Sequence, residues 1–257
     1  MSSESQPGSS AGACSPEEWQ LRCDLAALYR LAGRFGMSDL IYTHISARLP
    51  GDDDAFLINP FGVLFKDITA SSLVKIDQAG RIVDPAMASV RVNPAGFNIH
   101  SAVHMARHEL TCVIHSHTSA GMAVSAQKQG LLPITQHAMM FYEQIAFHDY
   151  ESFATQEDER VRIARDLGDK DIMILRNHGM LVGGRSIGEA FHTAYHLERA
   201  CEAQIMALSG GAALNFPPEE VARATARRMA GMSQEHFAFF WKSCVGLLST
   251  DDGDYRS

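Results

Sequence analysis

Two short apolar segments followed directly by a long amphipathic segment constrain the fold of this chain more than any other feature. The apolar segments are DIMIL (171–175) and MLVGG (180–184), and Asn177-His178-Gly179 lies between them. Short apolar runs bounded by Asn and Gly predict a pair of strands joined by a tight turn, in which Gly179 would allow a positive φ. From 187 to 208 apolar residues recur at helical spacing, which predicts a helix with one buried face. A strand pair leading into such a helix favours a layered structure.

The rest of the chain repeats this mixture of short strands and helices. Strands are predicted at 41–49, 55–60, 62–65 and 112–116, with a hairpin over 73–84; helices are predicted at 16–36, 97–108, 119–128 and 158–168, with two more between 217 and 248. Ser15 is the expected N-cap of the first helix. The pattern predicts an α/β or α+β three-layer domain over 16–210, preceded by a disordered tail at 1–15 and followed by a helical extension at 211–257.

Composition excludes several classes of function. The formal net charge is −8 and no dense Lys/Arg run occurs, so neither nucleic acid nor an anionic membrane is an expected partner. No apolar run reaches the roughly 18 residues of a membrane span, and the polar, Gly/Ser-rich start does not resemble a signal peptide. The five cysteines are scattered and include no Cys-x-x-Cys pair, which predicts reduced thiols and a cytoplasmic protein.

A His-x-His pattern at the end of a strand is the main candidate for chemistry. His115 and His117 in CVIHSHT lie two residues apart, so both imidazoles project from the same face of an extended chain. His178, in the predicted turn, could supply a third imidazole, and three imidazoles with an open position are typical of a catalytic zinc ion. The chain has 12 histidines, so spacing alone leaves the choice of the third ligand open.

The stretches around these histidines resemble the class II aldolase/adducin superfamily. The matching segments span about residues 21–207 and include GMSDLIYTHISARLPG, FLINPFGVLFKDIT, NPAGFNIHSAVHMARHELTCVIHSHT, GLLPITQHA, IAFHDYE and ILRNHGMLVGGRSIGEAFHTAYHLERACEAQ. The resemblance implies a mixed, mostly antiparallel central sheet flanked by helices. It also implies that His115, His117 and His178 bind a divalent ion, most often Zn²⁺, with Mn or Fe as alternatives. It further implies a homotetramer with active sites at subunit interfaces.

The chain departs from the pattern of the family's sugar-phosphate aldolases. Those enzymes carry Pro-Ser-Ser-Glu where this chain has Asn93-Pro94-Ala95-Gly96, so glycine replaces the catalytic carboxylate and no serine remains to hold phosphate. Within their Gly-Asn-x-Ser motif, His44 replaces the Asn, and Phe61-Gly62 stands where they have Thr-Gly. These differences predict that the chain does not cleave a sugar phosphate.

Three hypotheses of function follow. The first is a metal-dependent lyase that decarboxylates, or cleaves a C–C bond of, a small non-phosphorylated carbonyl compound or hydroxy acid through a metal-stabilised enolate. The second is a non-catalytic scaffold, because NPAGFNIHSA, GLLPI and AFHDY most resemble the head domain of adducins. The third is an Fe(II)-dependent oxygenase, a class that the superfamily also contains.

Several other side chains are candidates for proton transfer or substrate binding. We predict His137 and Tyr142, in the segment TQHAMMFYEQIAFHDY, as the catalytic or substrate-facing pair. For His148 a structural hydrogen bond is predicted, and for His192 with His196 a packed or solvated helix face. Surface salt bridges are expected for Arg48 and Arg91. No nucleophile elbow surrounds Ser116 or Ser119, which argues against a serine hydrolase; His44, His100 and Glu143 remain further candidates.

Overall fold

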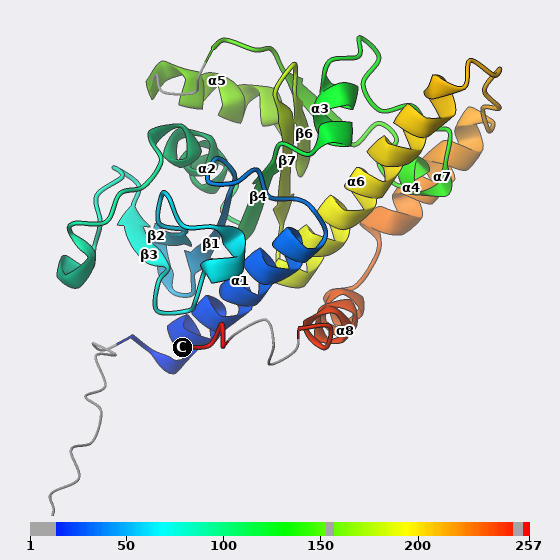
Figure 1. Cartoon of the computed structure of the whole chain (residues 1–257). Helices are drawn as coiled ribbons and strands as arrows, with labels where there is room; N and C mark the ends of the chain where they lie inside the picture. The colour runs from blue at the N-terminus through cyan, green and yellow to red at the C-terminus, as the bar shows by residue number, and fades with distance from the viewer. Residues whose placement is uncertain (1–13, 153–156, 249–253) are drawn as a thin grey trace, which may run out of the picture.

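A computed structural model describes residues 14–152, 157–248 and 254–257 (Figure 1). The predicted tail therefore lies almost entirely outside the described residues. One sheet runs through the molecule, and its strands are β1 (His44–Leu49), β2 (Asp52–Ile58), β3 (Val74–Asp77), β4 (Cys112–Ser116), β5 (Ile145–His148), β6 (Ile172–Leu175) and β7 (Gly179–Gly184). The principal helices are α1 (Pro16–Arg34), α2 (Pro94–Ala106), α3 (Ser119–Ser125), α4 (Gln136–Met139), α5 (Glu157–Leu167), α6 (Ile187–Ser209), α7 (Glu219–Ala230) and α8 (Gln234–Val245).

The strand order is β3-β2-β1-β4-β7-β6-β5. Neighbouring strands are antiparallel except for β5 and β6, which are parallel. The expected mixed, mostly antiparallel sheet flanked by helices is thus confirmed. Because β4 is the central strand, its last residues lie between β1 on one side and the β6–β7 turn on the other.

The alternation of side chains along β4 separates two apolar layers. Cys112 and Ile114 pack into the core that contains α1 and α6, whereas Val113 packs into the core that contains α2 and α5. Since side chains two apart share a face of a strand, His115 lies on the same face as Val113, toward α2. Helices therefore cover both faces of the sheet, as in a three-layer αβα structure (Figure 1).

Side-chain caps explain where the helices begin. Ser15 Oγ accepts a hydrogen bond from Glu18 N at 3.1 Å, which confirms the predicted cap of α1. Asn93 Oδ1 accepts from Ala95 N at 3.1 Å, so α2 begins at Pro94, three residues earlier than the predicted helix. This extra turn places Gly96 inside the helix instead of in a loop.

The structure differs from the predicted elements at three places. Segment 62–65 is not a strand: Gly62 has φ +94, and Phe65 begins the short 3₁₀ helix η1 (Phe65–Asp67), where its ring packs edge-on against Tyr29. The hairpin over 73–84 is present, but its second arm forms only an antiparallel bridge between Ile76 and Ile82 and backbone hydrogen bonds beside it, and the 3₁₀ helix η2 (Pro85–Met87) follows. The short helix α4 was not predicted, because it spans only one turn.

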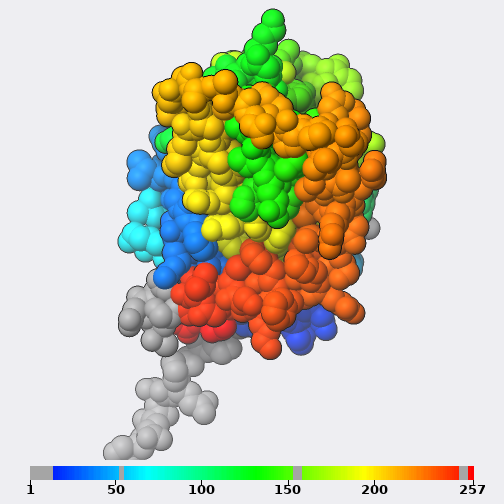
Figure 2. Space-filling view, turned by 90° about the vertical axis from the view of Figure 1, so that its right-hand side faces the viewer, coloured from blue at the N-terminus to red at the C-terminus, as the bar shows by residue number. Residues whose placement is uncertain are grey.

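The two helices predicted near the C-terminus pack against the main body. Gly188 of α6 approaches so closely that a Cβ there would lie 2.6 Å from the carbonyl oxygen of Phe237 in α8. Figure 2 shows α6, α7 and the segment around α4 forming one face, with α8 along its lower edge. The boundary at residue 210 stays a prediction. Among the described helices, none is long and apolar enough to cross a membrane.

Candidate metal centre

The histidines of the His-x-His pattern meet the histidine of the β6–β7 turn. His117 Nε2 lies 2.8 Å from His115 Nε2 and 2.9 Å from His178 Nε2. Among the described residues these three form the single group whose potential metal-ligating atoms all lie within 4.8 Å of one another. Strand alternation thus brings two imidazoles to one point, and strand pairing brings the third.

The turn that carries His178 reaches β4 for a different reason from the one predicted. Asn177, not Gly179, adopts the positive φ, at +57°, a conformation that Asn tolerates better than most residues. Gly179 is required for space, because a Cβ there would lie 2.3 Å from the carbonyl oxygen of Ser116. The missing side chain lets the turn pack against the end of β4.

Hydrogen bonds on the far side of two rings determine which nitrogens face one another. His115 Nδ1 lies 3.0 Å from the carbonyl oxygen of Met180, and His117 Nδ1 lies 3.1 Å from Asp39 Oδ2. Both oxygens can only accept, so each Nδ1 carries the proton and each Nε2 of the neutral rings presents a lone pair. Two lone pairs 2.8 Å apart repel each other unless a cation lies between them.

Burial favours the neutral form of His115 and His178. Desolvation, followed by the neighbouring histidines, lowers the pKa of His178 to about 4 and holds the pKa of His115 well below its ordinary value. Only the neutral ring can ligate a metal, so this environment suits a ligand set. Three converging imidazole nitrogens, on rings of which two have their Nδ1 atoms anchored by acceptors, fit a zinc-like divalent ion, which favours imidazole ligands.

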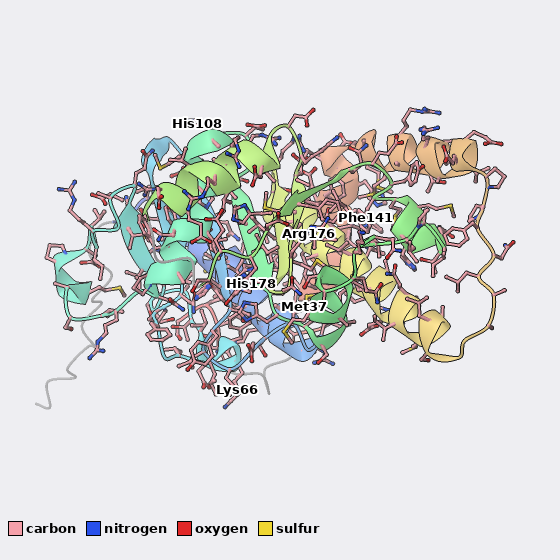
Figure 3. All side chains as sticks on the ribbon, turned by 90° about the horizontal axis from the view of Figure 1, so that it is seen from above. Met37, Lys66, His108, Phe141, Arg176 and His178 are labelled. Atoms are coloured by element: carbon pink, nitrogen blue, oxygen red, sulfur yellow. The ribbon has the colours of Figure 1, made fainter. Side chains whose placement is uncertain are left out.

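The centre opens toward solvent on one side. The side chain of His117 is 15% exposed, whereas His115 is 2% exposed. The ring of Tyr150, itself half exposed, lies 6.2 Å from the ring of His178, centroid to centroid. In the view from above, His178 lies toward the middle of the molecule and His108 at its edge (Figure 3).

The predicted pair His137 and Tyr142 makes its contacts elsewhere within this chain. His137, on α4, stacks on His196 of α6 with ring centroids 5.1 Å apart. Tyr142 lies under the guanidinium of Arg223 on α7, at 5.7 Å, and its neighbour Glu143 forms an ion pair with the same arginine. The structure therefore does not bring this pair together with the three histidines of one chain.

The remaining candidates have structural surroundings. His148 hydrogen bonds to Asp166 at 2.7 Å, in agreement with the predicted structural role. His192 is buried and packs against the ring of Phe240, so the predicted packed face of α6 is observed. Arg48 is not a surface residue as predicted: it is buried and donates to the carbonyl of His104. Arg91 is exposed.

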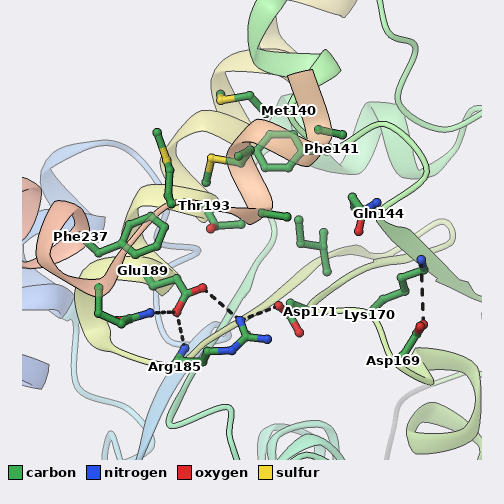
Figure 4. Close-up of a pocket in the computed structure, with 17 residues that line it drawn as sticks. Met140, Phe141, Gln144, Asp169, Lys170, Asp171, Arg185, Glu189, Thr193 and Phe237 are labelled. Atoms are coloured by element: carbon green, nitrogen blue, oxygen red, sulfur yellow. Dashed lines mark hydrogen bonds and ion pairs between the residues drawn. The ribbon is translucent and has the colours of Figure 1, made fainter. Parts of the chain in front are cut away.

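A cavity separate from the histidine centre lies at the other end of β7. Its volume is about 500 Å³, and residues from β6, β7, α6, α7 and α8 line it. Figure 4 shows Arg185 bonded there to both Asp171 and Glu189, and Lys170 paired with Asp169. Because these charged side chains are paired with one another, they are less available to bind a ligand than the nitrogens of the histidine centre.

A family model matches the sequence, and a solved structure matches the fold. The model for the "Class II Aldolase and Adducin N-terminal domain" matches residues 23–205. The crystal structure of an aldolase II superfamily protein from Pseudomonas syringae is 49% identical, covers 97% of this chain and 100% of its own, and has a TM-score of 0.91. The chain belongs to the class II aldolase/adducin family.

Within this family, the chain is similar both to an aldolase and to an adducin. L-fuculose 1-phosphate aldolase from Glaciozyma antarctica PI12 is 29% identical over 98% of this chain and 97% of its own, with a TM-score of 0.80. Alpha-adducin of Rattus norvegicus is 47% identical over 203 residues, which is 79% of this chain but 28% of the adducin.

Sequence reasoning missed two parts of the centre. Asp39 lies in a loop far from the His-x-His motif in sequence, and no spacing rule connects it to His117. The acceptor for His115 is a backbone carbonyl, which no side-chain pattern can reveal. The segment GMSDLIYTH, which contains Asp39, belongs to the stretches that resemble the family, but the resemblance gives no contact to Asp39.

Proposed function

We propose that this chain is a divalent-metal-dependent lyase that decarboxylates, or cleaves a C–C bond of, a small carbonyl compound or hydroxy acid without a phosphate group. His115, His117 and His178 would hold the ion, with Zn²⁺ as the first candidate. The observation that carries the proposal is the 2.8 Å separation of the Nε2 atoms of His115 and His117, whose Nδ1 atoms both face hydrogen-bond acceptors. When bound, a divalent ion supplies Lewis-acid polarisation of a substrate oxygen and stabilises developing negative charge.

The residues at the start of α2 support a substrate without phosphate. Pro94, Ala95 and Gly96 form the first turn of this helix and carry neither a hydroxyl nor a carboxylate. Asn93 Oδ1 already accepts the capping hydrogen bond of the helix. The similarity to the protein named L-fuculose 1-phosphate aldolase therefore supports cleavage of a C–C bond as the reaction type, but it does not support a phosphorylated substrate.

The predicted roles of His137 and Tyr142 require a second copy of the chain. Because their contacts within one chain are with α6 and α7, they would serve a metal centre across an interface, as in the predicted homotetramer. Two observations favour such a contact near the centre: Leu40 is 69% and Tyr42 53% exposed, and both follow Asp39, the partner of His117. Large exposed apolar side chains commonly mark contact surfaces.

A scaffold without catalysis is the second candidate. The identity of 47% with alpha-adducin favours it, since that match covers most of the present chain. The two candidates differ at the metal centre: an enzyme needs an open coordination position, whereas a scaffold needs none.

Metal analysis of the purified, untagged protein tests the proposal. The wild type is expected to hold about one zinc-like ion per chain, and His115→Ala/His117→Ala to hold none, because two of three ligands are removed. Loss of the ion with an unchanged oligomeric state would establish the metal site on which the lyase depends. Iron as the sole bound metal, together with oxygen consumption, would favour an oxygenase. A wild type that stays metal-free after reconstitution with Zn²⁺, Mn²⁺ and Fe²⁺ would leave the scaffold as the better account.

A further inference from the structure

His44 is a buried imidazole beside the metal centre, and it is not one of the three histidines of that centre. It begins β1 and is the register partner of His115 on β4, so the two side chains share one face of the sheet. Their rings are nearly parallel, at 11°, with centroids 6.2 Å apart. His44 is 3% exposed. Throughout the described part of the chain, neither of its ring nitrogens has a hydrogen-bond partner.

The glycine at position 96 makes room for this ring. A Cβ on Gly96 would lie 2.7 Å from atoms of the His44 imidazole, closer than such contacts occur. The ring therefore occupies the space into which a side chain at position 96 would extend. The sequence departs from the family's sugar-phosphate aldolases at positions 44 and 96. In the structure these two departures are linked, because the His44 ring fits only when position 96 has no side chain.

The neighbouring histidines behind His44 form hydrogen bonds with Ser46 and not with His44. Its other neighbour, His100, stands edge-on at 6.0 Å, and His100 Nδ1 is bonded to Ser46 Oγ at 2.6 Å. Ser46 Oγ also bonds to His104 Nε2 at 2.7 Å. These inner histidines each have one internal partner, whereas His44, the one nearest the metal centre, has none.

A buried imidazole with two unpaired nitrogens is costly and is expected to have a partner from outside the chain. The centre opens beside His117, which is partly exposed, while His115 and His44 are buried on its inner side. Because the His44 ring faces the His115 ring at 6.2 Å, a small molecule held at the three imidazoles would lie next to His44. A neutral imidazole offers one N–H donor and one acceptor, which suits an oxygen of an organic acid.

We propose that His44 is a substrate-binding residue, whose imidazole N–H donates a hydrogen bond to one oxygen of a 2-hydroxy or 2-oxo acid held at the centre of His115, His117 and His178. Such acids carry two oxygens on adjacent carbons. One oxygen would face the three imidazoles while the other reaches His44. This inference rests on the proposed function and specifies its class of substrate.

Binding of glycolate and acetohydroxamate to the Zn²⁺- or Co²⁺-loaded full-length protein tests the inference by calorimetry. His44→Phe keeps a ring of similar shape over Gly96 but removes both nitrogens. We expect unchanged metal content and affinity for glycolate weakened by about 10-fold to 100-fold, the range for one hydrogen bond to a charged group. In the Co²⁺ protein, the absorption change on adding glycolate should require correspondingly higher concentrations.

His192→Phe is the matched control. His192 is also buried with an unpaired Nδ1, but it lies on α6 among aromatic rings. This variant should bind glycolate like the wild type. His44→Gln, which restores an N–H donor, should recover most of the lost affinity and covers the case in which the phenylalanine variant does not fold.

Each contrary result has a distinct meaning. Wild-type glycolate affinity in a metal-loaded His44→Phe protein overturns the role of His44, as does loss of the ion itself in that variant. A metal-loaded wild type that binds neither glycolate nor acetohydroxamate overturns the substrate class. A wild type that holds no ion refutes the proposed function first, and the inference about His44 with it.

Discussion

At the scale of single residues, hydrogen bonds behind the metal-facing atoms decide what the centre can bind. Asp39 and the Met180 carbonyl accept from the Nδ1 atoms of His117 and His115. Because an acceptor fixes the position of the ring proton, it also fixes where the lone pair points. Without these acceptors, the same three histidines would have no fixed tautomer or ring orientation, and their lone pairs would not be held toward one point.

Removing the Asp39 carboxylate should weaken metal binding without removing a ligand. For Asp39→Ala we expect the dissociation constant for Zn²⁺ to rise by about 10-fold to 100-fold, since the ring of His117 loses its orienting acceptor. Competition with a chromophoric chelator measures this constant. Asp169→Ala, a highly exposed carboxylate away from the centre, is the control. Equal affinities in both variants would contradict the orienting role.

Gly179 should tolerate no side chain. Its Cβ would lie 2.3 Å from a backbone oxygen of β4, so Gly179→Ala must displace the turn that carries His178. We expect a loss of about 1–3 kcal/mol in the free energy of unfolding, as for other overpacked sites. Gly210→Ala, where no atom lies within 4 Å, should be neutral or slightly stabilising in the same urea titration. A stable Gly179→Ala protein would show that the turn can move freely.

At the scale of elements, helix caps and close helix contacts connect the C-terminal helices to the sheet. Ser186 caps α6 by accepting from Glu189 N at 3.2 Å, and its hydroxyl donates to Gln234 Oε1 at the start of α8. One hydroxyl thus serves both the start of the helix that follows β7 and the attachment of the extension. The glycine contact between α6 and α8 lies in the same turn.

Ser186→Ala should therefore destabilise the fold by about 1 kcal/mol, the usual effect of losing an N-cap. Thermal or urea unfolding measures it. Ser209→Ala is a suitable control, because this exposed serine donates only to a carbonyl in the last turn of α6. If both substitutions had the same small effect, the cap would contribute nothing beyond an ordinary surface hydroxyl.

At the scale of the whole molecule, buried histidines make stability depend on pH. Burial, and then the charge of Arg48, lowers the pKa of His104 to about 3 from an ordinary value of 6.5. Between these values the unfolded chain binds a proton that the folded chain does not. Stability from this group is therefore complete above about pH 6.5 and is lost as pH falls, at about 1.4 kcal/mol per pH unit.

His104→Gln should reduce the slope of unfolding free energy against pH by an amount that corresponds to close to one bound proton. Urea titrations between pH 4.5 and 7.5, with EDTA present to exclude metal effects, give the slope. His108→Gln, an exposed histidine just beyond the same helix, should leave the slope unchanged. A wild-type slope in His104→Gln would mean that His104 takes up its proton in the folded protein.

Most of the architecture could be predicted from the sequence because it depends on local periodicity. The strand pair 171–184, the long helix α6 and the two C-terminal helices were all predicted. Segment 62–65 was missed because four apolar residues cannot distinguish a strand from a buried turn. The start of α2 differs from the prediction because the helical pattern begins at Phe97, whereas the side-chain cap by Asn93 starts the helix at Pro94.

The sequence by itself determined the family, since its motifs are runs of neighbouring residues, and the resemblance to that family implied the mixed sheet and the choice of His178 as the third imidazole. Only the tertiary structure decided how these parts relate. Strand pairing sets His44 beside His115, the absence of a Cβ at Gly96 gives that ring its space, and a loop carries Asp39 to His117. These relations join residues distant in the chain, and distances between such residues are fixed by packing, which no local pattern encodes.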